Sequence, residues 1–92
     1  MITKTWQEIE NAAKQGSVLL FPIGVIEEHG PHLPLGCDIY WSSHMCRLVQ
    51  TALKKRGQES LLVPDYHWGV NFCTGNFPGS FSLKPETMTQ VL

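Results

Sequence analysis

The sequence has no surplus of basic charge, no long apolar run and few cysteines, and each absence excludes a class of protein. Lys and Arg number 7 and Asp and Glu number 8, so the net charge of −1 offers no basic surface for nucleic acid. The longest apolar run is broken by Pro22 and Gly24 and is too short to cross a bilayer. Residues 1–4 lack the apolar segment of a secretory signal. We therefore expect no nucleic-acid partner and no membrane association.

The three cysteines, Cys37, Cys46 and Cys73, are an odd number and show no CxxC spacing. This pattern favours reduced thiols in a cytoplasm over a disulfide framework. A zinc site with cysteine ligands is a less supported alternative. The 92 residues allow one small domain with a modest core, and the hydrophobic fraction of 42% is ordinary for a globular chain.

Helical and strand patterns alternate along the chain, which is typical of an α/β fold. Residues 5–8 match a capping box, which predicts the start of a first helix. The apolar run that follows predicts a strand buried on both faces, as in a parallel sheet. The expected elements, in the order helix, strand, helix, strand, helix, are 6–15, 17–26, 39–56, 60–64 and a last helix that begins near Pro85.

Ionisable side chains are concentrated where the first predicted strand ends. Glu27 and His29 are two residues apart, so an extended backbone places both on one face and Glu28 on the other. Asp38 follows after a loop shaped by glycine and proline. Sites in open α/β sheets form at such strand ends, and two carboxylates with an imidazole suit Zn, Mn or Fe. The pattern predicts a metal site at Glu27, His29 and Asp38.

Simpler interpretations exist for the same residues. Glu-x-His pairs occur by chance on many surfaces, and an Asp at the start of a helix is most often an N-cap. Within the helix at 39–56, His44 is expected to be a surface or packed side chain. Residue types alone therefore leave the metal site as one hypothesis among several.

Residues 26–38, Ile-Glu-Glu-His-Gly-Pro-His-Leu-Pro-Leu-Gly-Cys-Asp, closely resemble the opening motif of the creatininase (creatinine amidohydrolase) family. Residues 76–83, Asn-Phe-Pro-Gly-Ser-Phe-Ser-Leu, are similar to the Phe-Pro-Gly-Thr-x-Ser-Leu segment of the same family. The resemblance implies a three-layer α/β/α fold with a mainly parallel sheet. It also implies a metal-dependent enzyme that hydrolyses a C–N bond of a small amide or cyclic amide with metal-activated water.

The resemblance further implies roles for individual residues. Glu27 would be a terminal ligand of one divalent ion and His29 of a second, with Asp38 bridging the two. His32 matches a family histidine that orients a ligand or substrate, and we expect it to be the catalytic residue of this segment. The implied cofactor is a pair of divalent ions, Zn, Mn or Fe. Creatinine, a formamide, another lactam and a guanidine-like amide are all open as substrates.

The sequence departs from the family pattern in two places. Cys73 and Thr74 stand where many members carry a Glu-His pair, so no role is transferred to them. Cys37 replaces a small residue before Asp38, which is a mild change.

Family domains are considerably longer than this chain, and their later part supplies further metal ligands. We therefore expect residues 1–92 to be the N-terminal portion of a creatininase-like α/β domain, either truncated or one piece of an assembly. A homo-oligomer or a complementing chain is the expected partner. The alternatives are a catalytically incomplete fragment that mainly associates with another chain, and a simple metal-binding fragment.

Overall fold

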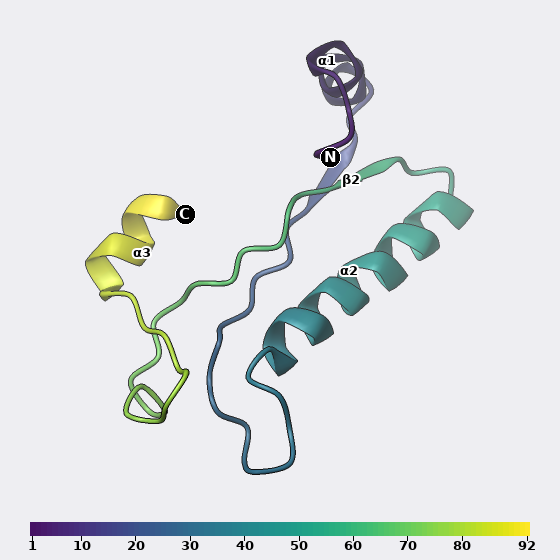
Figure 1. Cartoon of the computed structure of the whole chain (residues 1–92). Coiled ribbons are helices and arrows are strands. Elements are labelled where there is room, and N and C mark those ends of the chain that lie inside the picture. Colours follow the sequence, from purple (N-terminus) through teal and green to yellow (C-terminus); the bar gives the residue numbers. More distant parts are fainter.

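A computed structural model describes residues 1–92 (Figure 1). Its elements follow the predicted order and are α1 (Trp6–Lys14), β1 (Val18–Leu20), α2 (Cys37–Lys55), β2 (Ser60–Leu62) and α3 (Pro85–Val91). The helix at the N-terminus begins with the predicted capping box. Thr5 Oγ1 accepts a hydrogen bond from the Glu8 backbone N–H, and the Thr5 N–H donates to Glu8 Oε2 at 2.7 Å. The bond from the Thr5 N–H to the Glu8 carboxylate, with a further bond from the Thr5 hydroxyl, lowers the pKa of that carboxyl.

The sheet is a parallel pair in which Val18 lies opposite Ser60 and Leu20 opposite Leu62. The predicted parallel sheet is thus confirmed, but the strands are far shorter than the predicted 17–26 and 60–64. The physical reason is the buried Pro22, which has no N–H to donate to a ladder.

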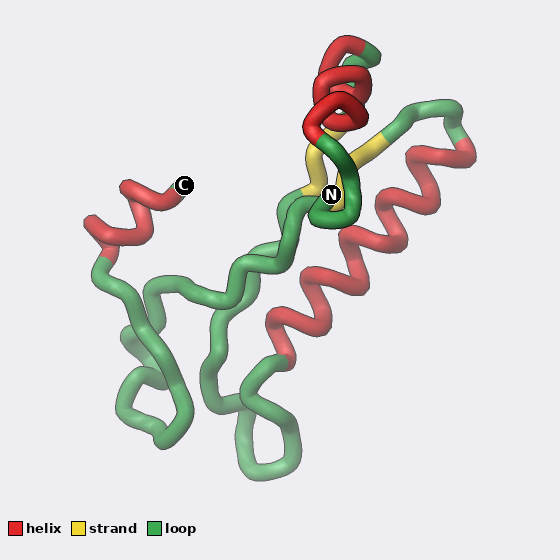
Figure 2. The backbone as a smooth tube through the Cα atoms, turned by 45° about the horizontal axis from the view of Figure 1, so that its top comes forward, coloured by secondary structure: helices red, strands yellow, loops and turns green.

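Backbone pairing nevertheless continues beyond the strands as an irregular extension. The Tyr66 N–H donates to the Pro22 carbonyl, and the Gly24 N–H donates to the Tyr66 carbonyl, both at 3.0 Å. A single parallel bridge joins Ile23 to Tyr66. Figure 2 shows the result, in which two short strands are followed by long irregular segments that run alongside one another.

Helix α2 runs back along the paired segments and packs against β2 (Figure 1). It begins at Cys37 rather than at residue 39, with Gly36 as its N-cap. The extended segment approaches the first turn of α2 at the buried Gly24. A Cβ atom at this position would lie 2.6 Å from the backbone nitrogen of Ile39. Only glycine permits so close an approach of the backbone to the helix.

The motif at residues 76–83 attaches to the segment that follows β1. The Phe81 N–H donates to the Ile26 carbonyl at 2.9 Å, and Ser80 Oγ accepts from the Glu28 N–H at 3.1 Å. These bonds flank Glu27 on both sides. The second motif therefore fixes the backbone of the first.

The same motif also attaches to the segment that follows β2. The Leu83 N–H donates to the Gly69 carbonyl at 2.8 Å, and Ser82 Oγ accepts from the Asn71 N–H at 2.9 Å. Gly69 and Asn71 are both buried. Residues 80–83 thereby link the two extended segments where the regular pairing has ended.

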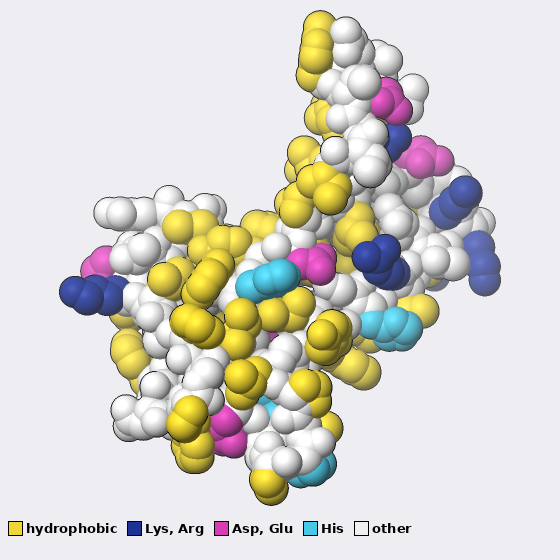
Figure 3. All heavy atoms as spheres, in the orientation of Figure 1, with side chains coloured by type: hydrophobic (Ala, Val, Ile, Leu, Met, Phe, Trp, Pro, Cys, Tyr) yellow, Lys and Arg dark blue, Asp and Glu magenta, His cyan; other side chains and the backbone are white.

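Most large apolar side chains lie on the surface (Figure 3). Leu61 is the one buried residue of the hydrophobic core, whereas Tyr40 and Trp41 of α2 are 70% and 68% exposed. The radius of gyration is 15.9 Å, against about 12 Å for a compact chain of this length. The 92 residues therefore leave faces of the sheet and of α2 uncovered. No helix combines the length and apolar character needed to cross a membrane.

We predict that Gly24→Ala lowers the free energy of unfolding by about 1–3 kcal/mol, the usual cost of overpacking. The added Cβ would press on backbone atoms of Asp38 and Ile39, which cannot rotate away. Urea unfolding followed by circular dichroism measures the change. Gly36→Ala is the control, because its Cβ would meet only the movable ring of Tyr40, at 3.3 Å. Equal losses in the two variants would contradict the prediction.

Candidate metal centre

Two of the predicted site residues, Glu27 and His29, lie in the loop after β1, and a hydrogen bond joins the two ends of this loop. The Glu27 N–H donates to the Leu35 carbonyl at 3.1 Å, which joins the start of the loop to its end. Glu28 Oε2 accepts from the Gly30 N–H at 2.8 Å, and Gly30 has a φ of 81°. This positive φ is one that glycine adopts without strain. The loop thus turns sharply after His29 and returns to the start of α2.

Asp38 lies in the first turn of α2, inside the helix rather than at its cap. Its Oδ1 atom lies 3.0 Å from Nε2 of His29. The interpretation of Asp38 as the N-cap is therefore wrong, because Gly36 occupies that position and Asp38 faces the loop. The carboxylate is available for the site.

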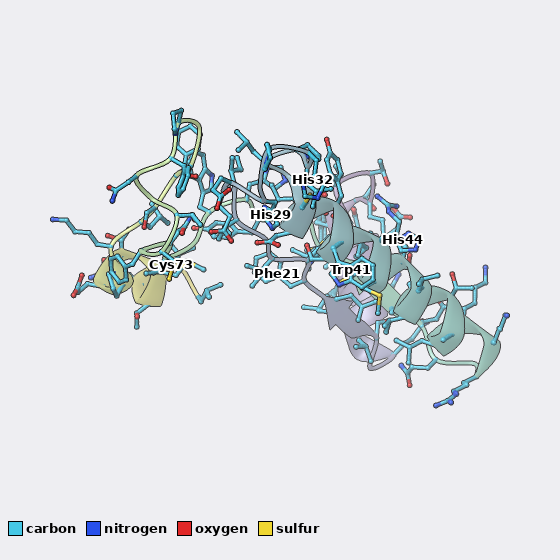
Figure 4. The ribbon with its side chains drawn as sticks, turned by 90° about the horizontal axis from the view of Figure 1, so that it is seen from below. Phe21, His29, His32, Trp41, His44 and Cys73 are labelled. Atoms are coloured by element: carbon cyan, nitrogen blue, oxygen red, sulfur yellow. The ribbon has the colours of Figure 1, made fainter.

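The structure brings Glu27, His29 and Asp38 together. One ligand atom from each residue lies within 4.8 Å of the others, and all three residues are half-buried. Figure 4 shows His29 beside the first turn of α2, with His44 further along that helix. His32 is exposed on the loop and makes no hydrogen bond. Its assignment as the catalytic residue stays a prediction.

The imidazole of His29 is held at both nitrogens. Nδ1 lies 3.1 Å from the Glu27 carbonyl oxygen, which can only accept, so Nδ1 carries the proton. Nε2 faces the Asp38 carboxylate, which also only accepts, so a protonated Nε2 donates to it. Once that proton is lost, Nε2 is the nitrogen that could bind a metal. The bond to the Glu27 carbonyl raises the pKa of His29 above its usual value, and the Asp38 carboxylate raises it further.

The structure adds to the site one residue, Thr74, to which the sequence analysis transfers no role. Thr74 Oγ1 donates to Oε2 of Glu27. The loop after β2 thus lies at the same end of the sheet as Glu27. Cys73, beside it in the chain, is exposed and free, and Figure 4 shows it away from His29.

An open pocket of about 440 Å³ adjoins two of the three clustered residues. Its lining consists of His29, Cys37, Asp38, Tyr40, Trp41 and His44. A larger hollow of about 580 Å³ contains none of the cluster and is lined by Arg47, Asp65 and His67 among others. The smaller pocket is the one relevant to the cluster, because the side chains of His29 and Asp38 open into it.

The donor set fits a divalent first-row metal. Zinc binds imidazole nitrogen and carboxylate oxygen at about 2.0–2.2 Å, so two ligands of one ion lie up to about 4.4 Å apart. The ligand atoms lie within 4.8 Å of one another, so small side-chain movements at most are needed to reach that limit. Three protein ligands and an open position are typical of catalytic zinc sites. A pair of ions would need more ligands than these three.

The fold and the site together define an α/β protein with a carboxylate–imidazole cluster that could hold a metal ion. The family model described as Creatininase, creatinine amidohydrolase, matches residues 3–92. The chain therefore belongs to the creatininase family, as its two motifs indicate.

Individual relatives agree with this assignment. The creatinine amidohydrolase of Pseudomonas putida is 31% identical over 91 residues, which cover 92% of this chain and 33% of the relative. The mycofactocin precursor peptide peptidase of Mycobacterium tuberculosis is 30% identical over 79 residues, or 80% of this chain and 32% of the relative. The chain thus spans about a third of the length of these proteins.

Solved structures confirm the creatininase-like α/β fold. A crystal structure of creatinine amidohydrolase (creatininase) superposes with a TM-score of 0.77 at 29% identity, covering 96% of this chain and 34% of that one. A mutant creatininase gives a TM-score of 0.81. The named relatives are an amidohydrolase and a peptidase, so this is a family of hydrolases with more than one substrate.

We predict that Asp38→Asn lowers the pKa of His29 in the metal-free chain, because the imidazolium loses a negative partner. A raised folded pKa means that the contribution of His29 to stability is complete below its unfolded pKa of about 6.5. That contribution is lost as the pH rises through the folded pKa. An NMR titration of His29 measures the shift, with Asp65→Asn as a control of equal charge. A His29 titration unchanged by Asp38→Asn would contradict the assignment.

Proposed function

We propose that residues 1–92 supply part of the metal centre of a creatininase-type hydrolase, which cleaves a C–N bond of a small amide or cyclic amide. The observation that carries the proposal is the convergence of Glu27, His29 and Asp38 in a member of this family. The P. putida relative is named for creatinine and the M. tuberculosis relative for a peptide. A C–N bond next to a carbonyl is the chemistry that the two names share.

Each clustered residue has a distinct part in the proposal. Glu27 and His29 would be terminal ligands of two divalent ions, of Zn, Mn or Fe, and Asp38 would bridge them. When bound, such ions lower the pKa of a water molecule and polarise a carbonyl oxygen. The Glu27 carbonyl keeps the Nδ1 proton of His29 in place and so presents Nε2 to the ion.

The surroundings of the cluster suit a small substrate. Tyr40 and Trp41 line the pocket beside His29 and offer flat apolar surfaces to an amide or a ring. His32 lies on the loop between the ligands, and we propose that it orients substrate there. Its exposure leaves the imidazole free to make that contact.

The whole reaction needs groups beyond these 92 residues. Three protein ligands are too few for two ions that each retain a position for water. The chain corresponds to about a third of its relatives, and the uncovered apolar faces of α2 and the sheet need a partner surface. We propose that a second copy or a complementing chain covers them. The three free cysteines suit a cytoplasmic location for such an assembly.

A second candidate function is association without catalysis. The exposed side chains of Phe21, Trp41, Leu48 and Phe72 favour it, since a monomer rarely exposes so many large apolar groups. Metal binding distinguishes the two candidates. Self-association without any bound metal would favour this alternative, and a chain that binds one ion without turnover would be a simple metal-binding fragment.

We predict that Asp38→Ala lowers the affinity for Zn²⁺ or Mn²⁺ at least about 10-fold, because a ligand is removed. Glu28→Gln is the control, since Glu28 Oε2 is engaged with the Gly30 N–H and lies outside the cluster. Isothermal titration calorimetry measures affinity, and elemental analysis of the purified chain measures bound metal. An equal loss in both variants, or an unmodified chain that binds neither metal, would contradict the metal centre.

We also predict that the isolated chain self-associates and hydrolyses amides poorly. Its exposed apolar faces drive association, and its ligand set is incomplete. Size-exclusion chromatography with light scattering and an amide-hydrolysis assay test the two parts. A monodisperse monomer with turnover close to that of full-length relatives would contradict both.

A further inference from the structure

The hydroxyl of Thr74 lies between two oxygen atoms at the edge of the metal cluster. Thr74 Oγ1 lies within donating distance of Oε2 of Glu27 and of Oδ1 of Asn71, both of which are acceptors. A threonine hydroxyl has a single proton to donate. Donation to an ionised carboxylate is roughly twice as strong as donation to a neutral amide oxygen, so the proton belongs with Glu27.

Asn71 determines where that hydroxyl lies. It is 5% exposed, and its Oδ1 accepts from the Thr74 backbone N–H at 3.2 Å. The Asn71 N–H is held in turn by Ser82 Oγ at 2.9 Å. The amide side chain therefore fixes the backbone of Thr74 from a buried position that is itself anchored.

The consequence for Glu27 concerns which of its oxygens can bind a metal. Oε2 accepts from Thr74, whereas Oε1 has no hydrogen-bond partner in the chain. A carboxylate held at one oxygen loses the freedom to rotate and presents the other oxygen in a single direction. The backbone on either side of Glu27 is already fixed through Ser80 and Phe81. The bonds of Ser80 and Phe81 leave the side chain of Glu27 free to rotate, and Thr74 restrains it.

We propose that Thr74 is a positioning residue for Glu27, which directs Oε1 toward the divalent ion, and that Asn71 holds Thr74 in place. This inference rests on the proposed metal centre and deepens it. Thr74 does not touch the ion in this scheme. Its effect is exerted through the orientation of the ligand.

The test compares Thr74→Val with Thr74→Ser. Valine keeps the shape of threonine and removes the hydroxyl, so we expect Zn²⁺ affinity to fall about 10–100-fold, the usual effect of losing a partner of a ligand. Serine keeps the hydroxyl and should restore affinity. Thr51→Val is the matched control, because the Thr51 hydroxyl bonds only to the Arg47 carbonyl of its own helix. Calorimetric titration with Zn²⁺ gives all four affinities.

A second measurement separates positioning from general stabilisation. The thermal unfolding midpoint of the metal-free chain should change no more in Thr74→Val than in Thr51→Val, while Zn²⁺ affinity falls only in the former. Unchanged affinity in Thr74→Val, or failure of Thr74→Ser to restore it, would overturn this inference and leave the metal centre intact. No Zn²⁺ binding by the unmodified chain would overturn the proposed function, and this inference with it.

Discussion

The parallel pairing of the two extended segments is the constraint on which the site depends. Parallel strands end at the same edge, so the residues after β1 and β2 must emerge side by side. Beyond Pro22 the two segments are paired through the backbone hydrogen bonds of Tyr66. Further along, residues 80–83 bond to both segments and so connect them. Each of these steps brings the loop that carries Thr74 to the loop that carries Glu27. The ligand cluster is the end point of this pairing.

The cluster combines two backbone environments that differ in rigidity. Asp38 is carried by a long helix, whose first turn is fixed by contact with Gly24. Glu27 and His29 are carried by irregular backbone, whose position is kept by hydrogen bonds with Leu35, Ser80 and Phe81. A metal site requires ligands held to within a fraction of an ångström. Hydrogen bonds from the motif at 76–83 hold the backbone around Glu27, just as helical hydrogen bonds hold the backbone of Asp38.

The sequence predicts the order of the elements and the identity of the cluster because both depend on local patterns. The capping box at Thr5, the proline at the start of α3 and the spacing of Glu27 and His29 are all read from neighbouring residues. The strand predicted over 17–26 is too long because that prediction follows apolar character and gives no weight to Pro22, which interrupts the ladder. The contact of Thr74 with Glu27 could not be predicted, since it depends on how 80–83 draws two distant segments together.

The separation of these contacts along the chain has a consequence for folding. Thr74 reaches Glu27 across 47 residues, and Ser80 reaches Glu28 across 52. The helices, by contrast, close their bonds within a single turn and can form before any distant segment arrives. A chain that had formed only its helices would show a far-ultraviolet circular dichroism signal close to that of the folded protein. It would nevertheless lack the hydrogen bonds that restrain Glu27. The metal affinity of the chain therefore depends on long-range contacts that a measurement of helix content does not detect.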